Sequence, residues 1–151
     1  MKRPGIRPAR IAAVMALATM LLAAAPASAA PVVSTITVSS FFPDPVEPFT
    51  TTGGVLCDSG TALTDFDHFG GGPRAGTFHL TKTLTCDDGS GTFTIRVEAK
   101  VIFGAPTDNG GWAVMGGTGD YENLHGGGSI VGTYVFDPDG IIDVYTGIVM
   151  N

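Results

Sequence analysis

Eight short runs of β-forming residues, separated by turn signals, constrain the fold of this 151-residue chain more than any other feature. The runs are rich in Val, Ile, Thr, Phe and Tyr, whereas the segments between them, such as DSG, GGGPRAG, DDGSG, APTDNGG and DPDG, favour turns. No segment shows the 3.6-residue period of an amphipathic helix. The expected strands are 32–39, 54–57, 61–69, 77–86, 92–103, 112–115, 129–136 and 141–150.

Regular spacing of such strands predicts one all-β domain, an eight-stranded antiparallel β-barrel, with a β-sandwich as the alternative. The segment FFPDPVEPF contains three prolines, which favour an extended crossing at a sheet edge over a central strand. In the run 92–103, apolar residues alternate with Thr, Arg, Glu and Lys. Period two therefore predicts one apolar and one charged face, but it leaves open which face lines the lumen of a barrel.

Glycine interrupts the chain between Met115 and Gly128, in the segment MGGTGDYENLHGGG. Glycine has no side chain to pack and costs backbone entropy, so this segment is not expected to form one continuous strand. We expect a glycine corner after the run 112–115, a short turn around 121–124, and a second glycine corner before the run 129–136. Such corners let a sheet bend or close on itself.

The first 29 residues have the pattern of a secretory signal peptide. A largely apolar stretch at 11–25 precedes Ala27-Ser28-Ala29, a small-x-small cleavage site. Four basic residues come before that stretch: Lys2, Arg3, Arg7 and Arg10. A membrane anchor is the alternative, but about 15 apolar residues are short for a bilayer span. We expect residues 1–29 to be removed, residues 30–151 to form a single β-barrel domain, and the protein to be secreted and extracellular.

Removal of the signal peptide leaves four Lys and Arg residues against fourteen carboxylates, a net charge of −10. Nucleic acids and anionic membranes both require clustered basic residues, so an acidic chain of this kind is not expected to bind either one.

The two cysteines, Cys57 and Cys86, each end an apolar run and precede a turn of Asp, Ser and Gly. No further Cys or His stands at the spacing of a zinc site, so we expect these two residues to form a disulfide bond. A pair of free thiols is the alternative, which an oxidising compartment disfavours.

The segment VMGGTGDYENLHGGGSIVGTYVFDPDGIIDVYTGIV resembles the C-terminal signature of the allene oxide cyclase and dirigent β-barrel superfamily. The signature is GGTG, an aromatic residue, a short turn, a further glycine, a strand ending near Tyr-x-Phe-Asp, and a last strand. The similarity covers 112–149, about a third of the mature chain. It implies an eight-stranded barrel with a central cavity, often assembled into dimers or trimers, so we expect a homo-oligomer.

The resemblance implies chemistry that needs neither a metal nor a cofactor. The family includes cyclases that fold a reactive epoxide and dirigent proteins that orient radicals or quinone methides. Asp120 stands where some dirigent proteins carry an acidic residue, whereas His125 replaces the usual Arg, which weakens any transfer of dirigent chemistry. The structural positions of the signature are matched by Gly116, Gly117, Gly119, Tyr121 and Gly126.

Other motifs in the chain do not predict a metal site. GGTGD resembles one unit of a calcium-binding nonapeptide repeat, but a single unit cannot build the stacked roll that binds calcium. DPDG lies between two runs and predicts a hairpin turn. His68, His79 and His125 are scattered, with no i, i+4 pair. We therefore expect no metal and no cofactor.

The candidate catalytic residues, besides Asp120, are Arg96, Glu98, Asp143 and Tyr145. If these four side chains face the lumen, buried carboxylates beside Arg would have perturbed pKa values and could transfer protons. The alternative is a cross-strand ion pair on the outer wall. We expect a secreted barrel that binds a small apolar molecule or a protein without catalysis. The alternative is a cofactor-free isomerase, cyclase or dirigent-like enzyme that acts in the barrel lumen.

The signal peptide gives the first prediction. Expressed with its export machinery, the protein should accumulate outside the cell with Ala30 as its first residue, because cleavage follows Ala29. N-terminal sequencing of the protein in the medium measures this directly, and a chain that begins at Met1 would contradict it.

Overall fold

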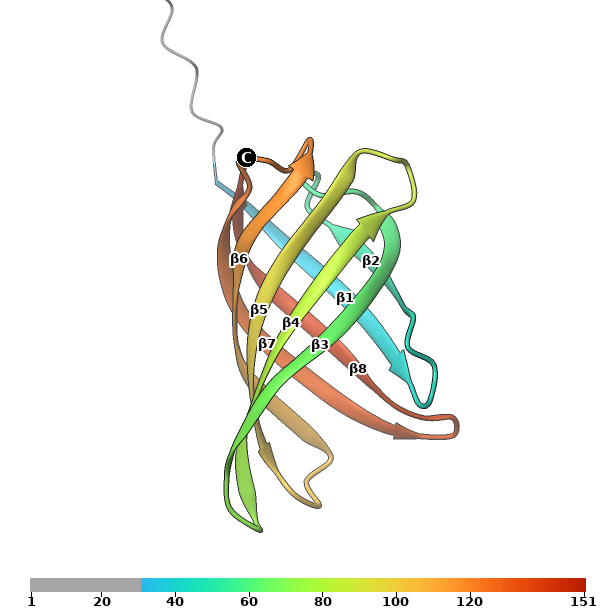
Figure 1. Cartoon of the computed structure of the whole chain (residues 1–151), viewed down its shortest axis with the longest axis vertical. Coiled ribbons are helices and arrows are strands. Elements are labelled where there is room, and N and C mark those ends of the chain that lie inside the picture. Colours follow the sequence, from blue (N-terminus) through green and yellow to red (C-terminus); the bar gives the residue numbers. More distant parts are fainter. Residues whose placement is uncertain (1–30) are drawn as a thin grey trace, which may run out of the picture.

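Eight antiparallel strands follow one another around a closed barrel, in which β1 pairs with β8 (Figure 1). The computed structural model describes residues 31–151, so the predicted signal peptide and its cleavage site lie outside the described residues. The strands are β1 (Val32–Phe41), β2 (Glu47–Thr52), β3 (Ser59–Gly71), β4 (Ala75–Cys86), β5 (Gly91–Ile102), β6 (Thr107–Gly119), β7 (His125–Phe136) and β8 (Asp139–Met150). The predicted barrel is confirmed, and the sandwich alternative is wrong.

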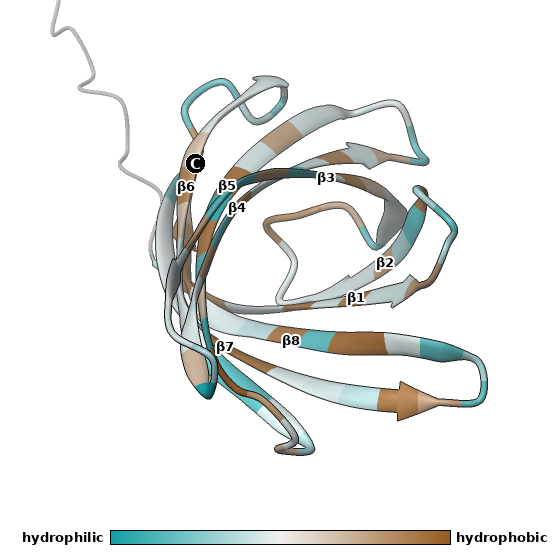
Figure 2. Ribbon diagram, turned by 60° about the horizontal axis from the view of Figure 1, so that its bottom comes forward, coloured by the Kyte–Doolittle hydropathy of each residue, from teal (hydrophilic) through white to brown (hydrophobic). Residues whose placement is uncertain are grey.

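The orientation of β5 settles which face of the strands lines the lumen. Phe93, Ile95 and Val97 are fully buried inside the barrel, whereas Arg96 lies on the outer wall and is exposed. The same alternation continues along β4, whose inward positions hold Leu80 and Leu84 and whose outward positions are mostly threonine. The apolar face therefore packs inward, and Figure 2 shows the alternating hydropathy along the strands.

One end of the barrel is closed by side chains and by the loop 53–58 between β2 and β3. Leu56 and Cys57 in this loop are buried, and Cys57 is bonded to Cys86 at the end of β4, as predicted. In the oblique view of Figure 2 the loop crosses within the ring of strands. The disulfide bond closes a 29-residue separation, which on a chain-entropy model contributes about 3–4 kcal/mol.

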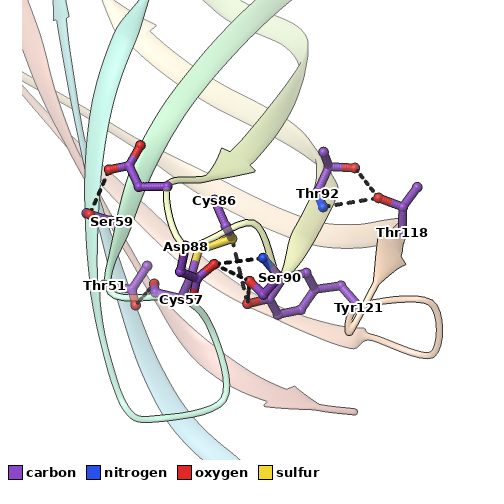
Figure 3. Close-up of a disulfide and its surroundings, with 10 residues drawn as sticks. Thr51, Cys57, Ser59, Cys86, Asp88, Ser90, Thr92, Thr118 and Tyr121 are labelled. Atoms are coloured by element: carbon purple, nitrogen blue, oxygen red, sulfur yellow. Dashed lines mark hydrogen bonds between the residues drawn. A yellow bond between two sulfur atoms is a disulfide. The ribbon is translucent and has the colours of Figure 1, made fainter.

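The turn between β6 and β7 is fastened to this closed end. The Tyr121 ring is buried, it packs against Phe93 with ring centroids 5.4 Å apart, and its hydroxyl lies 2.9 Å from the Ser90 hydroxyl (Figure 3). The Tyr121 hydroxyl also lies 3.6 Å from the sulfur of Cys86. The backbone N–H of Asp120 donates to the Ser90 carbonyl at 2.9 Å. Tyr121, the loop 53–58 and the disulfide bond together form a plug at this end of the barrel.

Three strands, β2, β6 and β7, differ from the sequence prediction. The second strand is Glu47–Thr52 and not 54–57, which belongs to the closing loop. Pro48 is tolerated because it lies near the start of β2, beyond the last residue pair of the β1–β2 ladder, Val38 with Phe49. The predicted edge crossing was therefore wrong for the second half of FFPDPVEPF.

β6 also differs, because it runs from Thr107 to Gly119, beyond both ends of the predicted run 112–115. The register with β5 shifts between Thr94 and Ile95, which face Gly116 and Val114. Met115 is therefore the extra residue of a β-bulge, and its side chain is exposed. The first expected corner is a bulge within a continuous strand. The second expected corner, before the run 129–136, is wrong, because β7 begins at His125 and its glycines pair with β8 in unbroken register.

The outer wall is divided by charge. Asp65, His79, Arg96 and Glu98 lie on the outer face of β3, β4 and β5. In contrast, the outward side chains of the middle of β1, β7 and β8 are uncharged: Val33, Thr35, Thr37, Ser129, Val131, Thr133, Val144, Thr146 and Ile148. Homo-oligomerisation stays a prediction, and this uncharged wall is where a subunit contact would be sought first.

The second prediction concerns the glycines at the closed end. A Cβ at Gly117 would lie 2.6 Å from the carbonyl oxygens of Thr92 and Tyr121, and Gly119 has a φ of +62°. Gly117→Val and Gly119→Val should each lower the free energy of unfolding by about 1–3 kcal/mol, or prevent folding.

The matched control is Gly70→Val in β3, where a Cβ would meet no atom within 4 Å. Thermal or urea unfolding of the three variants measures the effect. If the variants at Gly117 and Gly119 unfold like Gly70→Val, the glycines are not required by the geometry of the closed end.

Candidate functional site

The lumen opens at the end opposite the disulfide bond into a cavity of about 810 Å³. The turns that join β1 to β2, β3 to β4, β5 to β6 and β7 to β8 surround its opening (Figure 1). This volume lies within the range of about 300–1,000 Å³ typical of small-molecule sites. The outer part of the cavity is mostly apolar, and its lining includes Phe42, Phe66, Phe78, Leu80, Ile102, Phe103, Phe136 and Ile141.

The aromatic rings at the mouth of the cavity pack against one another but stay partly exposed to solvent. Phe66 and Phe78 pack edge to face with ring centroids 5.9 Å apart, and Phe69 links Phe78 to Phe103. Phe66, Phe103 and Phe136 are nevertheless 57%, 53% and 80% exposed. Large apolar side chains left exposed together are typical of an interaction surface, and a ligand-binding cavity is one such surface.

A buried ion pair lies on one side of the cavity floor. The ammonium group of Lys82, on the inner face of β4, donates to the Glu47 carboxylate at 2.5 Å and to the Thr64 hydroxyl at 2.6 Å. The Thr64 hydroxyl in turn donates to Glu47 at 2.9–3.0 Å. Lys82 is 2% exposed, so this charge is compensated inside the protein and not by water. Because β2, β3 and β4 are neighbours, their ladders bring the three side chains together.

Two carboxylates lie on the other side of the floor, on either side of Gly132. Gly132 in β7 pairs with Asp108 in β6 and with Asp143 in β8, so all three residues face the lumen in one row. Asp108 accepts hydrogen bonds from the Gly132 N–H at 3.0 Å and the Tyr134 hydroxyl at 3.3 Å. Asp143 accepts one from the Tyr145 hydroxyl at 3.3 Å. A Cβ at Gly132 would lie 2.7 Å from Asp143, so glycine makes room for both carboxylates.

Burial changes the proton affinity of these groups. Loss of hydration is the largest cause that raises the pKa of Asp143 from 3.8 to about 6, since the opposing charge of Lys82 only partly offsets it. The charges of Asp108 and Glu47 raise the Asp143 pKa further. Burial also raises the pKa of Asp108 and of Tyr134, and it raises that of Tyr145 well above 10.0. Asp143 thus exchanges its proton close to neutral pH.

The structure separates the catalytic candidates that the sequence grouped together. Asp143 lines the cavity, and Tyr145 lies beneath it, fully buried and in edge-to-face contact with Trp112. Arg96 and Glu98 lie on the outer wall of β5, where Glu98 is 3.9 Å from His79. The four side chains therefore do not form one site, and the alternative of an outer-wall location holds for Arg96 and Glu98.

The residues taken from the family signature lie at the closed end, away from the cavity. Asp120 and His125 are exposed, and the His125 ring is 2.9 Å from the carbonyl oxygen of Asn123. The side-chain amide of Asn151 donates to the Asp120 carbonyl. Neither Asp120 nor His125 lines the cavity.

Sequence reasoning missed Glu47, Lys82 and Asp108. A signal for Lys82 was present, because in HLTKTLTC it occupies the same period-two face as Leu80 and Leu84. A lone lysine on an apolar face needs a buried partner, but the partner Glu47 lay in a segment that was not expected to be a strand. Asp108 lay in a predicted turn.

Chemically, the floor offers acceptors and one proton-exchanging acid, without an arranged metal site. In the region 31–151, no group of three or more His, Cys, Asp and Glu side chains is placed to hold a metal ion.

No helix in the region 31–151 is long and apolar enough to cross a membrane. Comparison with protein-family models, curated proteins and solved structures finds no match for this chain. The cavity must therefore be interpreted from its own residues.

The raised pKa of Asp143 gives the third prediction. Between pH 4 and pH 6 the folded protein holds a proton on Asp143 that the unfolded chain releases, so this group stabilises the fold at pH 4 and loses that effect as pH rises through 6. Asp143→Asn removes this dependence. The change that this substitution causes in the free energy of unfolding should therefore be about 1–3 kcal/mol more favourable at pH 8 than at pH 4.

Urea unfolding of the wild type and the variant at both pH values measures the difference. Asp65→Asn, an exposed carboxylate on the outer wall of β3, is the matched control and should show no such difference. A stability difference between wild type and Asp143→Asn that is the same at pH 4 and pH 8 would contradict the assignment.

Proposed function

We propose that this chain is a secreted β-barrel protein, of the allene oxide cyclase and dirigent-like type, that binds one small, mainly apolar molecule without catalysis. The observation that carries the proposal is the cavity of about 810 Å³, open at one end and lined at its mouth by exposed aromatic rings. A ligand of suitable size would bury these rings and place its polar end at the floor. Burial of apolar area of this kind contributes about 25 cal/mol per Å².

Export to an extracellular compartment is the second part of the proposal. The bond between Cys57 and Cys86 is compatible with an oxidising compartment, where disulfide bonds persist. The N-terminal sequence has the basic, apolar and small-residue pattern of a signal peptide. The similarity of 112–149 to the barrel superfamily supports the family assignment, and the eight-stranded closed barrel is the fold that the assignment requires.

A cofactor-free isomerase or cyclase is the second candidate, and Asp143 is the residue that favours it. This carboxyl group faces the cavity, its pKa is raised to about 6, and the Tyr145 hydroxyl fixes one of its oxygens. Such a group is suited to general acid–base catalysis near neutral pH. Proton abstraction from a nitrobenzisoxazole probe that is lost in Asp143→Asn, but kept in Asp65→Asn, would favour this candidate over binding alone.

The fourth prediction tests binding with a neutral dye, N-phenyl-1-naphthylamine, whose fluorescence rises in apolar surroundings. One dye molecule should bind per barrel, with a dissociation constant in the micromolar range. Ala99→Phe should weaken dye binding by about tenfold or more, because Ala99 lines the cavity between Phe78 and Gly110 and a ring there would occupy the space.

Thr133→Phe places the same ring on the outer wall of β7 and should leave dye binding unchanged. If Ala99→Phe does not fold, Ala99→Leu fills part of the same space and should weaken binding by a smaller factor. Dye that does not bind the wild type, or that binds Ala99→Phe and Ala99→Leu as tightly as wild type, would rule out the cavity as the binding site.

A further inference from the structure

The charges on the cavity wall do not balance. Among the cavity-lining residues the charged ones are Glu47, Lys82, Asp108 and Asp143, which makes three carboxylates against one ammonium group. Lys82 is already matched by Glu47 at 2.5 Å. Asp108 and Asp143 therefore have no cation of their own on the described wall, although Asp108 is 5% and Asp143 is 6% exposed. Buried carboxylates are usually paired, so this pair stands out as a place for an external positive charge.

Hydrogen-bonding capacity at the floor is also incomplete. Asp143 accepts a hydrogen bond through Oδ2, from Tyr145, and no side chain in the described region donates to its Oδ1. Ser40 lines the same cavity, is 4% exposed, and its hydroxyl has no hydrogen-bond partner in the described part of the protein. A buried hydroxyl without a partner costs free energy unless something supplies the missing hydrogen bond. The unsatisfied serine is an observation independent of the carboxylates, and it points to a polar ligand group in the cavity.

The residues between the mouth and the floor of the cavity also favour a positively charged ligand. Aromatic rings line the mouth, and the faces of Phe and Tyr rings attract organic cations. The turns around the opening carry Asp44 and Asp137, and Asp139 is the first residue of β8, whereas Arg74 is the one basic residue in the turns that the structure describes there. A positively charged molecule is therefore attracted at the mouth, along the rings and at the floor.

We propose that the ligand of this cavity is an apolar organic cation, an amine with a hydrophobic body whose ammonium group is held by Asp108 and Asp143. This inference rests on the proposed binding function and names the class of molecule that the site selects. The body of the amine packs against Leu80, Phe78 and Phe66, and the ammonium donates to the two carboxylates and to the Ser40 oxygen. An apolar anion of the same shape is excluded, because its head would meet an excess of carboxylates.

Three probes with the same ten-carbon chain separate charge from hydrophobicity: decylammonium, decanol and decanoate. Each is titrated below its micelle concentration, at constant ionic strength and pH 8, against bound N-phenyl-1-naphthylamine. Decylammonium should displace the dye at about tenfold lower concentration than decanol, and decanoate should be the weakest, because a hydrogen bond to an ionised carboxylate is about twice as strong as a neutral one.

The preference should depend on the two carboxylates and on pH. Asp108→Asn and Asp143→Asn should each reduce the advantage of decylammonium over decanol several-fold, whereas Asp65→Asn on the outer wall should not. In the wild type, the affinity for decylammonium should fall from pH 8 to pH 5, because Asp143 takes up a proton, while the affinity for decanol stays constant. The titratable groups that act on Asp143 are Tyr145 in β8, Tyr134 in β7, Asp108 in β6, Lys82 in β4 and Glu47 in β2.

Equal displacement by decylammonium and decanol at pH 8 would overturn the proposal and leave the binding function standing, since the neutral dye and decanol still bind. An advantage that falls equally in Asp65→Asn would also overturn it, because the effect would then come from overall charge. If the dye and all three probes fail to bind, both the cation proposal and the proposed function are wrong. The pH titration uses the wild-type protein alone, so the test stands even if an Asn variant does not fold.

Discussion

The ladder between β1 and β8, from Val32 paired with Val149 to Phe41 paired with Gly140, is the interaction on which the rest of the structure depends. It joins the first strand to the last and turns an open sheet into a tube with no free edge. Without it, the apolar inner face of β5 would have no opposite wall to pack against. It also places Val38 beside Asp143, which brings the Asp143 carboxylate into an interior otherwise filled by Phe49, Ile95 and similar side chains.

Within the tube, the charged residues mark the boundary between a packed half and an open half. Toward the disulfide bond, rings such as Phe49, Phe93 and Trp112 fill the lumen, whereas beyond Lys82 and Asp143 the lumen is empty enough to form a cavity. Burying charged groups costs free energy that replacement by apolar residues would avoid. The stability of the fold therefore does not explain a floor built from a lysine and three carboxylates, and the proposed binding of a ligand would.

The sequence predicted the barrel, the disulfide bond and the apolar–polar alternation of β5, because these depend on local patterns such as period two and turn residues. It misplaced β2 because a proline at the start of a strand costs little when its missing N–H faces no ladder, and the composition of the segment does not show this. It placed the end of β6 too early because a bulge at Met115 absorbs an extra residue without ending the strand. The position of Asp108 and Asp143 on either side of Gly132 could not be predicted, since it depends on the register of three strands.

The plug formed by the loop 53–58, Tyr121 and the disulfide bond makes the lumen a blind tube. Whatever enters must leave by the same opening and in reverse order, so two molecules cannot exchange by passing through. For the ligand proposed above, entry and departure would both pass the rings at the rim, Phe103 and Phe136 among them. A molecule longer than the cavity would keep its far end outside the barrel, in contact with solvent.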